Sequence, residues 1–181
     1  MKNIKRLTYI LAFILFGCSN DDSIISNGFK INGNFYETNY AAIGGGSSSH
    51  GLKFFSNFEI GYIASFALYS GDTSGNGELI AGTYTANKSP TSLFGIDGYD
   101  YIQFRDNTNS KKLAASPGWY NDSTFQSGSV TINSITSELN ENGYYIVTEI
   151  DIDYQFRIDE TNVVGSYNGP VQFSSLSDVP N

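Results

Sequence analysis

Apolar and polar residues alternate most regularly between residues 144 and 158. Most even positions are apolar, namely Tyr144, Ile146, Ile150, Ile152, Tyr154, Phe156 and Ile158, and the odd positions are Tyr145, Val147, Glu149, Asp151, Asp153, Gln155 and Arg157. A period of two places successive side chains on opposite faces of a β-strand, so this run predicts a strand with one buried and one solvated face. The run is long for one strand, and we therefore expect a bend or bulge within it.

Shorter runs of the same kind recur along the chain, with turn residues between them. Strands are predicted over residues 52–58, 60–69, 79–86, 99–105 and 129–135, and residues 163–173 supply the closing strand or strands. Near the start, Asn32-Gly33 is the strongest short hairpin signal, because both residues tolerate positive φ. We therefore predict an all-β fold, an antiparallel β-sandwich of about 8–10 strands, with an up-and-down, lipocalin-like β-barrel as the alternative.

Residues 106–128 lack any apolar period. A connection of this length is uncommon in a compact domain and is usually functional or mobile. It contains Trp119 and Tyr120 directly after Pro117-Gly118. If these rings are exposed they can stack on a sugar or anchor a protein contact, so we name Trp119 and Tyr120 as candidate ligand-binding residues. The alternative is that Trp119 folds back and plugs the end of the sandwich.

The N-terminus has the layout of an export signal. Lys2, Lys5 and Arg6 precede an apolar run over residues 7–16, which is too short for a bilayer core of about 30 Å. The run ends in Leu15-Phe16-Gly17-Cys18, which resembles the lipobox of bacterial lipoproteins. The resemblance implies that residues 1–17 are removed as a lipoprotein signal peptide, and that Cys18 is lipidated and becomes the new N-terminus.

Two further resemblances concern the place of the protein in the cell. Ser19-Asn20-Asp21-Asp22 resembles the export signal of surface lipoproteins of the Bacteroidota type. Phe29-Lys30-Ile31-Asn32-Gly33, together with segments between Gly128 and Val171, resembles small uncharacterised lipoproteins of that group. These resemblances imply an outer-membrane, lipid-anchored and surface-exposed protein. The expected organisation is residues 1–17 as signal peptide, 18–28 as lipidated cysteine and polar tether, and 29–181 as a single β domain.

Charge and composition narrow the choice of partners. The chain has 10 Lys and Arg against 18 Asp and Glu, and loss of the three basic residues of the signal lowers the net charge from −8 to −11. Such an acidic protein is repelled by the phosphates of nucleic acid, so we expect no nucleic acid as a partner. Cys18 is the one cysteine and His50 the one histidine, which excludes an internal disulfide and a multi-histidine zinc site. Because His50 lies in a Gly/Ser-rich stretch, we expect a solvent-exposed loop histidine.

Acidic residues provide the candidate metal and catalytic groups. Glu149, Asp151 and Asp153 share one face of the predicted strand, with neighbours roughly 6.5–7 Å apart. Such carboxylates could hold a hard cation such as Ca²⁺ or supply the acid and base of a glycosidase. The preferred interpretation is a solvated face that opposes edge-to-edge aggregation. Residues 72–78 resemble the front of a calcium loop, but Thr83 replaces the bidentate Glu, so we interpret the segment as a hairpin loop.

Three functional hypotheses remain open. The leading one is a non-enzymatic binding or accessory module, tethered to the membrane by its lipid, with a glycan or an envelope protein as partner and no cofactor. The second is a polysaccharide hydrolase that uses a carboxylate pair. The third is a barrel that carries a small apolar ligand in a cavity lined by the inward-facing residues Tyr62, Phe66, Ile102 and Phe104.

Overall fold

The computed structural model describes residues 27–45, 49–57, 61–69, 78–85, 95–96, 102–116 and 124–178. These residues form β-strands and one short 3-10 helix, η1 (Leu176–Asp178). None of the helical structure in this part of the chain is long and apolar enough to cross a membrane. The strands are β1 (Gly28–Ile31), β2 (Asn34–Glu37), β3 (Tyr40–Gly45), β4 (Ser49–Phe55), β5 (Tyr62–Tyr69), β6 (Gly82–Thr85), β7 (Gly95–Ile96), β8 (Ile102–Asp106), β9 (Lys111–Ser116), β10 (Phe125–Leu139), β11 (Tyr145–Ile158) and β12 (Thr161–Pro170).

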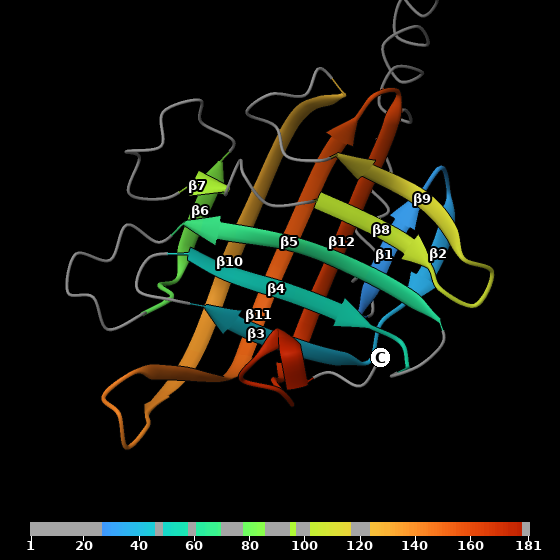
Figure 1. Cartoon of the computed structure of the whole chain (residues 1–181). Helices are drawn as coiled ribbons and strands as arrows, with labels where there is room; N and C mark the ends of the chain where they lie inside the picture. Colours follow the sequence, from blue (N-terminus) through green and yellow to red (C-terminus); the bar gives the residue numbers. More distant parts are fainter. Residues whose placement is uncertain are drawn as a thin grey trace, which may run out of the picture.

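The strands form two layers that face each other (Figure 1). The long-strand sheet has the order β2-β1-β12-β11-β10-β6, and the short-strand sheet contains β3, β4, β5, β8 and β9. β7 joins the layers along one side, because it pairs with β6 in parallel and with β5 antiparallel. At the other side β2 and β3 do not pair, so the sheets do not close into a barrel. The predicted antiparallel β-sandwich is therefore confirmed, and the barrel alternative is wrong.

The interior of the sandwich is filled with aromatic rings from both layers. Phe66 of β5 lies 5.1 Å from the rings of both Tyr154 and Phe156 of β11, measured between centroids. Phe54 and Phe104 complete the cluster, and all five side chains are at most 3% exposed. Each such burial contributes roughly 1.5–3 kcal/mol. Of the residues expected to line a carrier cavity, Phe66, Ile102 and Phe104 are buried core residues and Tyr62 packs against the same cluster.

Tyr154 fits into the core because the residue opposite it has no side chain. Gly165 of β12 pairs directly with Tyr154. A Cβ atom at Gly165 would lie 2.5 Å from the Tyr154 ring and 2.6 Å from the carbonyl oxygen of Gly28. The Tyr154 hydroxyl donates a hydrogen bond to that same oxygen, at 3.4 Å. Burial raises the pKa of the Tyr154 phenol, so the group stays neutral in the interior.

Bulges change which residues of the long strands face inward. The pairing of β10 with β11 skips Asn133 on β10 and Thr148 on β11. Beyond Thr148 the alternation reverses, so Val147 is buried at 6% exposed whereas Tyr144 is 52% exposed. A bulge was expected in this run and is confirmed. The sequence pattern assigns Tyr144 and Ile146 to the buried face and Val147 to the solvated face. This assignment is wrong, because the extra residue of the bulge moves every residue that precedes it in β11 to the opposite face.

Three strands were not predicted from the sequence, namely β3, β7 and β9. β3 lies between the predicted first hairpin and the strand that follows it, and β9 lies within residues 106–128. The prediction of a single irregular connection over 106–128 is therefore wrong for β9, which returns from β8 as a hairpin. The Asp106 carboxylate holds this turn by accepting hydrogen bonds from the backbone N–H and the side-chain amide of Asn109, at 3.2 and 2.7 Å.

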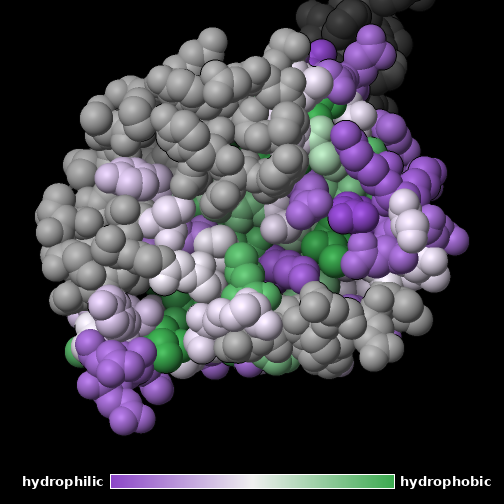
Figure 2. Space-filling view, viewed as in Figure 1, coloured by the Kyte–Doolittle hydropathy of each residue, from purple (hydrophilic) through white to green (hydrophobic). Residues whose placement is uncertain are grey.

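The C-terminal segment, Val171–Asp178, crosses to the short-strand sheet. The backbone N–H of Ile43 donates a hydrogen bond to the Phe173 oxygen, and the backbone N–H of Gln172 donates one to the Ala41 oxygen, both at 3.0 Å. Phe173 packs with Ala42 and Phe55 in a second apolar cluster. Figure 2 shows this side of the molecule, with hydrophilic side chains gathered at the β8–β9 and β10–β11 hairpins and apolar ones between them. The segment therefore covers the outer face of β3 and β4.

Replacing Gly165 with Ala tests the notch that receives Tyr154. The added methyl group must displace the Tyr154 ring or the β1 backbone, so we expect a loss of about 1–3 kcal/mol in the free energy of unfolding. Urea unfolding followed by circular dichroism measures it. The matched control is Val164→Ala on the same strand, which is 42% exposed and should cost less than about 0.5 kcal/mol. Equal midpoints for the two variants would contradict the proposed packing.

Candidate functional site

The outer face of the long-strand sheet carries short polar side chains in register. One row runs Thr85, Ser129, Gln155, Val164 and Lys30, across β6, β10, β11, β12 and β1. The next row runs Thr83, Thr131, Asp153 and Ser166 across the first four of these strands, and the two threonine hydroxyls lie 3.2 Å apart. These positions face outward because their neighbours along each strand, such as Tyr84, Val130 and Tyr154, fill the core.

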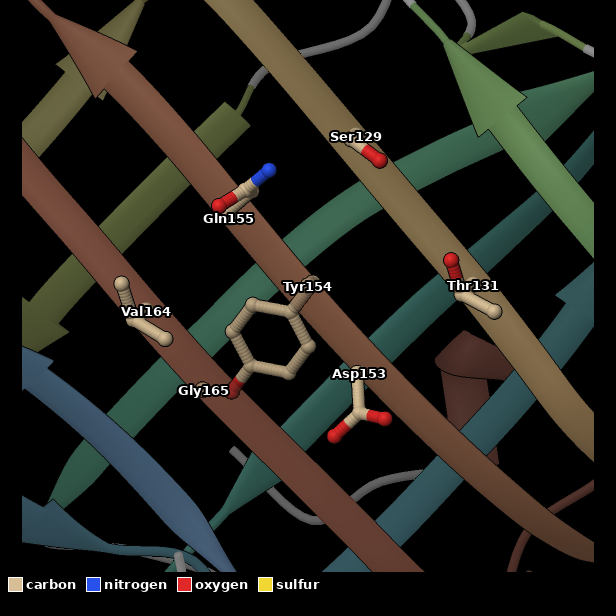
Figure 3. A pocket seen from close by; sticks show the side chains of 7 residues that line it. All are labelled: Ser129, Thr131, Asp153, Tyr154, Gln155, Val164 and Gly165. Atoms are coloured by element: carbon tan, nitrogen blue, oxygen red, sulfur yellow. The ribbon is translucent and has the colours of Figure 1, made fainter. Parts of the chain in front are cut away.

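Two shallow depressions adjoin on this face, and together they form what we call the outer trough. The first has a volume of about 260 Å³, and Figure 3 shows its lining residues Ser129, Thr131, Asp153, Tyr154, Gln155, Val164 and Gly165. The second has a volume of about 470 Å³ and shares Ser129, Gln155 and Val164 with the first. It extends the trough to Ser127, Arg157 and Asn162. The outer trough therefore follows β11 for several residues, with β10 and β12 as its sides.

Hydroxyl and amide groups dominate the chemistry of the outer trough. Along β11, Asp153, Gln155 and Arg157 occupy successive outward positions, so a negative, a neutral and a positive side chain follow one another. Ser127, Ser129 and Asn162 add neutral donors and acceptors. Val164, which is 42% exposed, supplies an apolar patch in the middle. Such a surface can form many hydrogen bonds to an uncharged polar ligand.

An exposed aromatic ring lies on the same outer face, beyond β12. Phe35 of β2 is 40% exposed and its ring covers Gly28, where an added Cβ atom would lie 2.6 Å from Cζ. Gly28 pairs with Ser166, and Ser166 pairs with Asp153. Strands in a sheet lie 4.7–4.9 Å apart, so the ring is roughly 10 Å from β11. Sequence reasoning missed Phe35 because it belongs to a predicted hairpin strand whose two faces the sequence does not distinguish.

The three acidic candidates of β11 are only partly brought together. The side-chain amide of Asn133 donates hydrogen bonds to both Asp151 and Asp153, at 3.2 and 2.8 Å. The partly positive N–H groups of this amide therefore occupy the position that a cation would take between the two carboxylates. Glu149 takes no part in these bonds. Among the described residues, no group of three or more His, Cys, Asp or Glu side chains is arranged to hold a metal ion.

Other residues singled out from the sequence lie elsewhere. Trp119 and Tyr120 are outside the described residues, as are Cys18 and the loop at residues 72–77. The expectation of an exposed loop histidine is wrong, since His50 belongs to β4 and is only 4% exposed. Glycine and serine around His50 were interpreted as loop composition, yet Gly51 is part of β4 and pairs with Gly44 of β3. The segment is a strand because β4 pairs with β3 on one side and β5 on the other, and amino-acid composition does not reveal such pairing.

Replacing both Asp151 and Asp153 with Asn tests whether these carboxylates bind metal. The new amide oxygens still accept hydrogen bonds from Asn133, and the repulsion between two like charges is removed. We expect the free energy of unfolding to stay within about 0.5 kcal/mol of the parent or to rise slightly. Thermal unfolding with Ca²⁺ and with EDTA provides the measurement. A parent protein that melts several degrees higher with Ca²⁺, an effect absent in the double variant, would establish a metal site.

Comparisons of this chain with protein-family models, with curated proteins and with solved structures give no match. The functional conclusions below therefore rest on the sequence signals and on the geometry of the described residues.

Proposed function

We propose that this protein is a non-enzymatic, lipid-anchored module of the cell envelope that binds a neutral glycan in the outer trough. The anchoring part rests on the basic start, the short apolar run and the lipobox-like ending at Cys18. The binding part rests on one observation, the in-register hydroxyl and amide side chains of β10, β11 and β12 on an open sheet face.

The composition of the outer trough favours a glycan over a protein partner. Stable protein interfaces have a core of aromatic and aliphatic anchors that fill pockets. Among its described lining residues, the outer trough offers a single exposed aliphatic one, Val164, which is surrounded by side chains such as Ser129, Gln155 and Asn162. A sugar ring presents hydroxyl groups at its edge and C–H groups on its faces. The edge matches the polar side chains, and a face can lie on Val164.

The dimensions and charge favour an extended and uncharged chain. β10 and β12 flank β11, so the trough is roughly two strand spacings wide, about 10 Å. The ring of Phe35, about the same distance beyond β11, offers a second contact for a chain that crosses the strands. A polyanionic glycan is disfavoured by the net charge of −8. Hydrolysis is the weaker candidate, because Asp151 and Asp153 both accept a hydrogen bond from Asn133 on an open face.

Replacing Cys18 with Ala tests the anchoring. Without a thiol no acyl chain can be attached, and each buried CH₂ group that is lost removes about 0.8 kcal/mol of membrane affinity. We expect the variant to leave the membrane fraction and the detergent phase, as measured by immunoblotting after phase partitioning. Ser19→Ala is the control and should stay with the membranes. Unchanged partitioning of Cys18→Ala would refute the lipoprotein assignment.

Replacing Gln155 with Ala tests the binding face. Linear neutral hexasaccharides of β-1,4-xylose, β-1,3-glucose and α-1,4-glucose serve as probes in isothermal titration calorimetry. One lost hydrogen bond, worth about 0.5–1.5 kcal/mol, predicts about a two- to tenfold weaker affinity for the hexasaccharide that binds the parent. Phe35→Leu keeps an apolar cover on Gly28 but removes the ring, and it should weaken binding to a similar extent.

Gln126→Ala provides the matched control, because Gln126 is an exposed β10 residue that does not line the outer trough. It should bind like the parent. If Gln155→Ala and Phe35→Leu bind as tightly as this control, the glycan lies elsewhere on the protein. If none of the three hexasaccharides binds the parent, the proposed ligand class is wrong.

A further inference from the structure

A second cavity lies at one end of the sandwich, away from the outer trough, and we call it the end pocket. It has a volume of about 210 Å³ and lies between the adjoining ends of β3 and β4, the β10–β11 hairpin and the C-terminal segment. Figure 1 shows the β10–β11 hairpin and the C-terminal segment in the lower part of the molecule. The residues that matter for its chemistry are His50, Asn140, Tyr144, Tyr145, Val147 and Ser174. None of its described lining residues also lines the outer trough.

The β10–β11 turn holds one wall of the end pocket in place. The side-chain oxygen of Asn140 accepts hydrogen bonds from the backbone N–H groups of Asn142 and Tyr144, at 3.0 and 2.9 Å. The backbone N–H of Asn140 donates to the Tyr144 oxygen, also at 2.9 Å, and Gly143 completes the turn with a φ of 78°. Tyr144 is therefore fixed at its backbone while its ring is 52% exposed.

The bulge at Thr148 gives the end pocket its apolar floor. Because the alternation reverses there, Val147 faces inward and is 6% exposed. The same reversal places Tyr145 on the side of Val147, whereas Tyr144 reaches the pocket from the loop that precedes β11. Gly44 and Gly45 of β3 also line the pocket, and the space beside them is filled by the chain itself, because an added Cβ atom would meet the backbone of Ser175 and Leu176 at Gly44 and that of Ser49 at Gly45. The bulge therefore decides which β11 side chains face the pocket.

The lining selects for a small and uncharged ligand. Among the described residues, no Asp, Glu, Lys or Arg side chain lines the end pocket, although the chain as a whole is strongly acidic. At a liquid share of about 30 Å³ per molecule, the volume would hold roughly seven waters. That is less than the 300–1,000 Å³ of most drug-sized sites and too small for a lipid chain. The pocket combines the two tyrosine rings with the imidazole of His50, the amide of Asn140 and the hydroxyl of Ser174. This combination suits a ligand with apolar faces and a polar rim.

A buried hydroxyl lies beside the floor of the end pocket. Ser137 pairs directly with Val147, and cross-strand partners place their side chains on the same face. The Ser137 hydroxyl oxygen is buried and forms no hydrogen bond with any described residue. A buried polar group without a partner costs about 1–3 kcal/mol, so this hydroxyl lowers the stability of the hairpin beside the pocket, although Ser137 itself does not line it.

We propose that the end pocket binds one neutral pyranose unit, with a face of the sugar against Tyr144 and its hydroxyl groups toward His50, Asn140 and Ser174. This binding is independent of the glycan-binding face proposed above, because no described residue lines both sites. A single sugar ring matches the volume of the end pocket. It is also uncharged, like the lining, and its C–H faces and hydroxyl rim match the tyrosine rings and the polar side chains of the pocket. The end pocket thus recognises the end or a branch of a glycan, not its extended backbone.

Saturation-transfer NMR on the full-length, detergent-solubilised protein tests the proposal. The probes are the methyl glycosides of glucose, galactose, mannose, xylose and N-acetylglucosamine, together with N-acetyltyrosinamide as an aromatic amide. We expect at least one glycoside to receive saturation at its C–H face. We expect Tyr144→Ala to lower that signal at least fivefold, and Ser174→Tyr, which places a ring in the end pocket, to abolish it.

Leu139→Ala is the matched control, because Leu139 lies on the same hairpin, is 59% exposed and does not line the end pocket. It should leave the signal unchanged, and Gln155→Ala in the outer trough is measured beside it. Loss of the glycoside signal in Gln155→Ala but not in Tyr144→Ala would move the site to the trough and overturn this proposal. Saturation of N-acetyltyrosinamide alone would show a pocket for peptide side chains, and no saturation of any glycoside would likewise refute the assignment.

Discussion

The ring of Tyr154 lies between the two sheets, where it packs against Phe54, Phe66 and Phe104 of the opposite layer. It can do so only because Gly165 leaves room beside it and because Gly28 offers a carbonyl to its hydroxyl. This contact connects β1, β11 and β12 to the short-strand sheet. With no disulfide possible, burial of aromatic surface is the main source of stability, and Tyr154 lies at its centre.

The inward direction of Tyr154 also fixes the direction of its neighbours. Asp153 and Gln155 must face outward, and through the register so must Ser129, Thr131 and Val164. The outer trough is thus the reverse side of the aromatic core. Beyond the bulge at Thr148 the same strand reverses its faces and contributes Val147 to the end pocket. One long strand, β11, therefore supplies residues to both candidate binding sites. The extra residue of the bulge, Thr148, lies between the part of β11 that lines the outer trough and the part that lines the end pocket.

The sequence predicts the period-two pattern well, because burial of one face dictates it over many residues. It therefore predicts the sandwich, and it predicts a bulge somewhere in residues 144–158. It does not reveal the bulge at Asn133, since a bulge depends on the register with a partner strand. The bond of Asn133 to two carboxylates was missed for that reason. Similarly, β9 is a strand because it pairs with β8, although Lys111 and Ala114 have little intrinsic preference for that state.

The most direct test of these conclusions is amide NMR of the protein labelled with ¹⁵N, titrated with the neutral hexasaccharide that binds it most tightly. A glycan in the outer trough predicts that the largest shift changes cluster at Ser129, Gln155 and Val164 on β10, β11 and β12, and that residues of β3 and β4 stay unchanged. Shift changes confined to the short-strand sheet would contradict the assignment of the binding face. Uniformly small changes throughout the sheet, at saturating hexasaccharide, would contradict it as well.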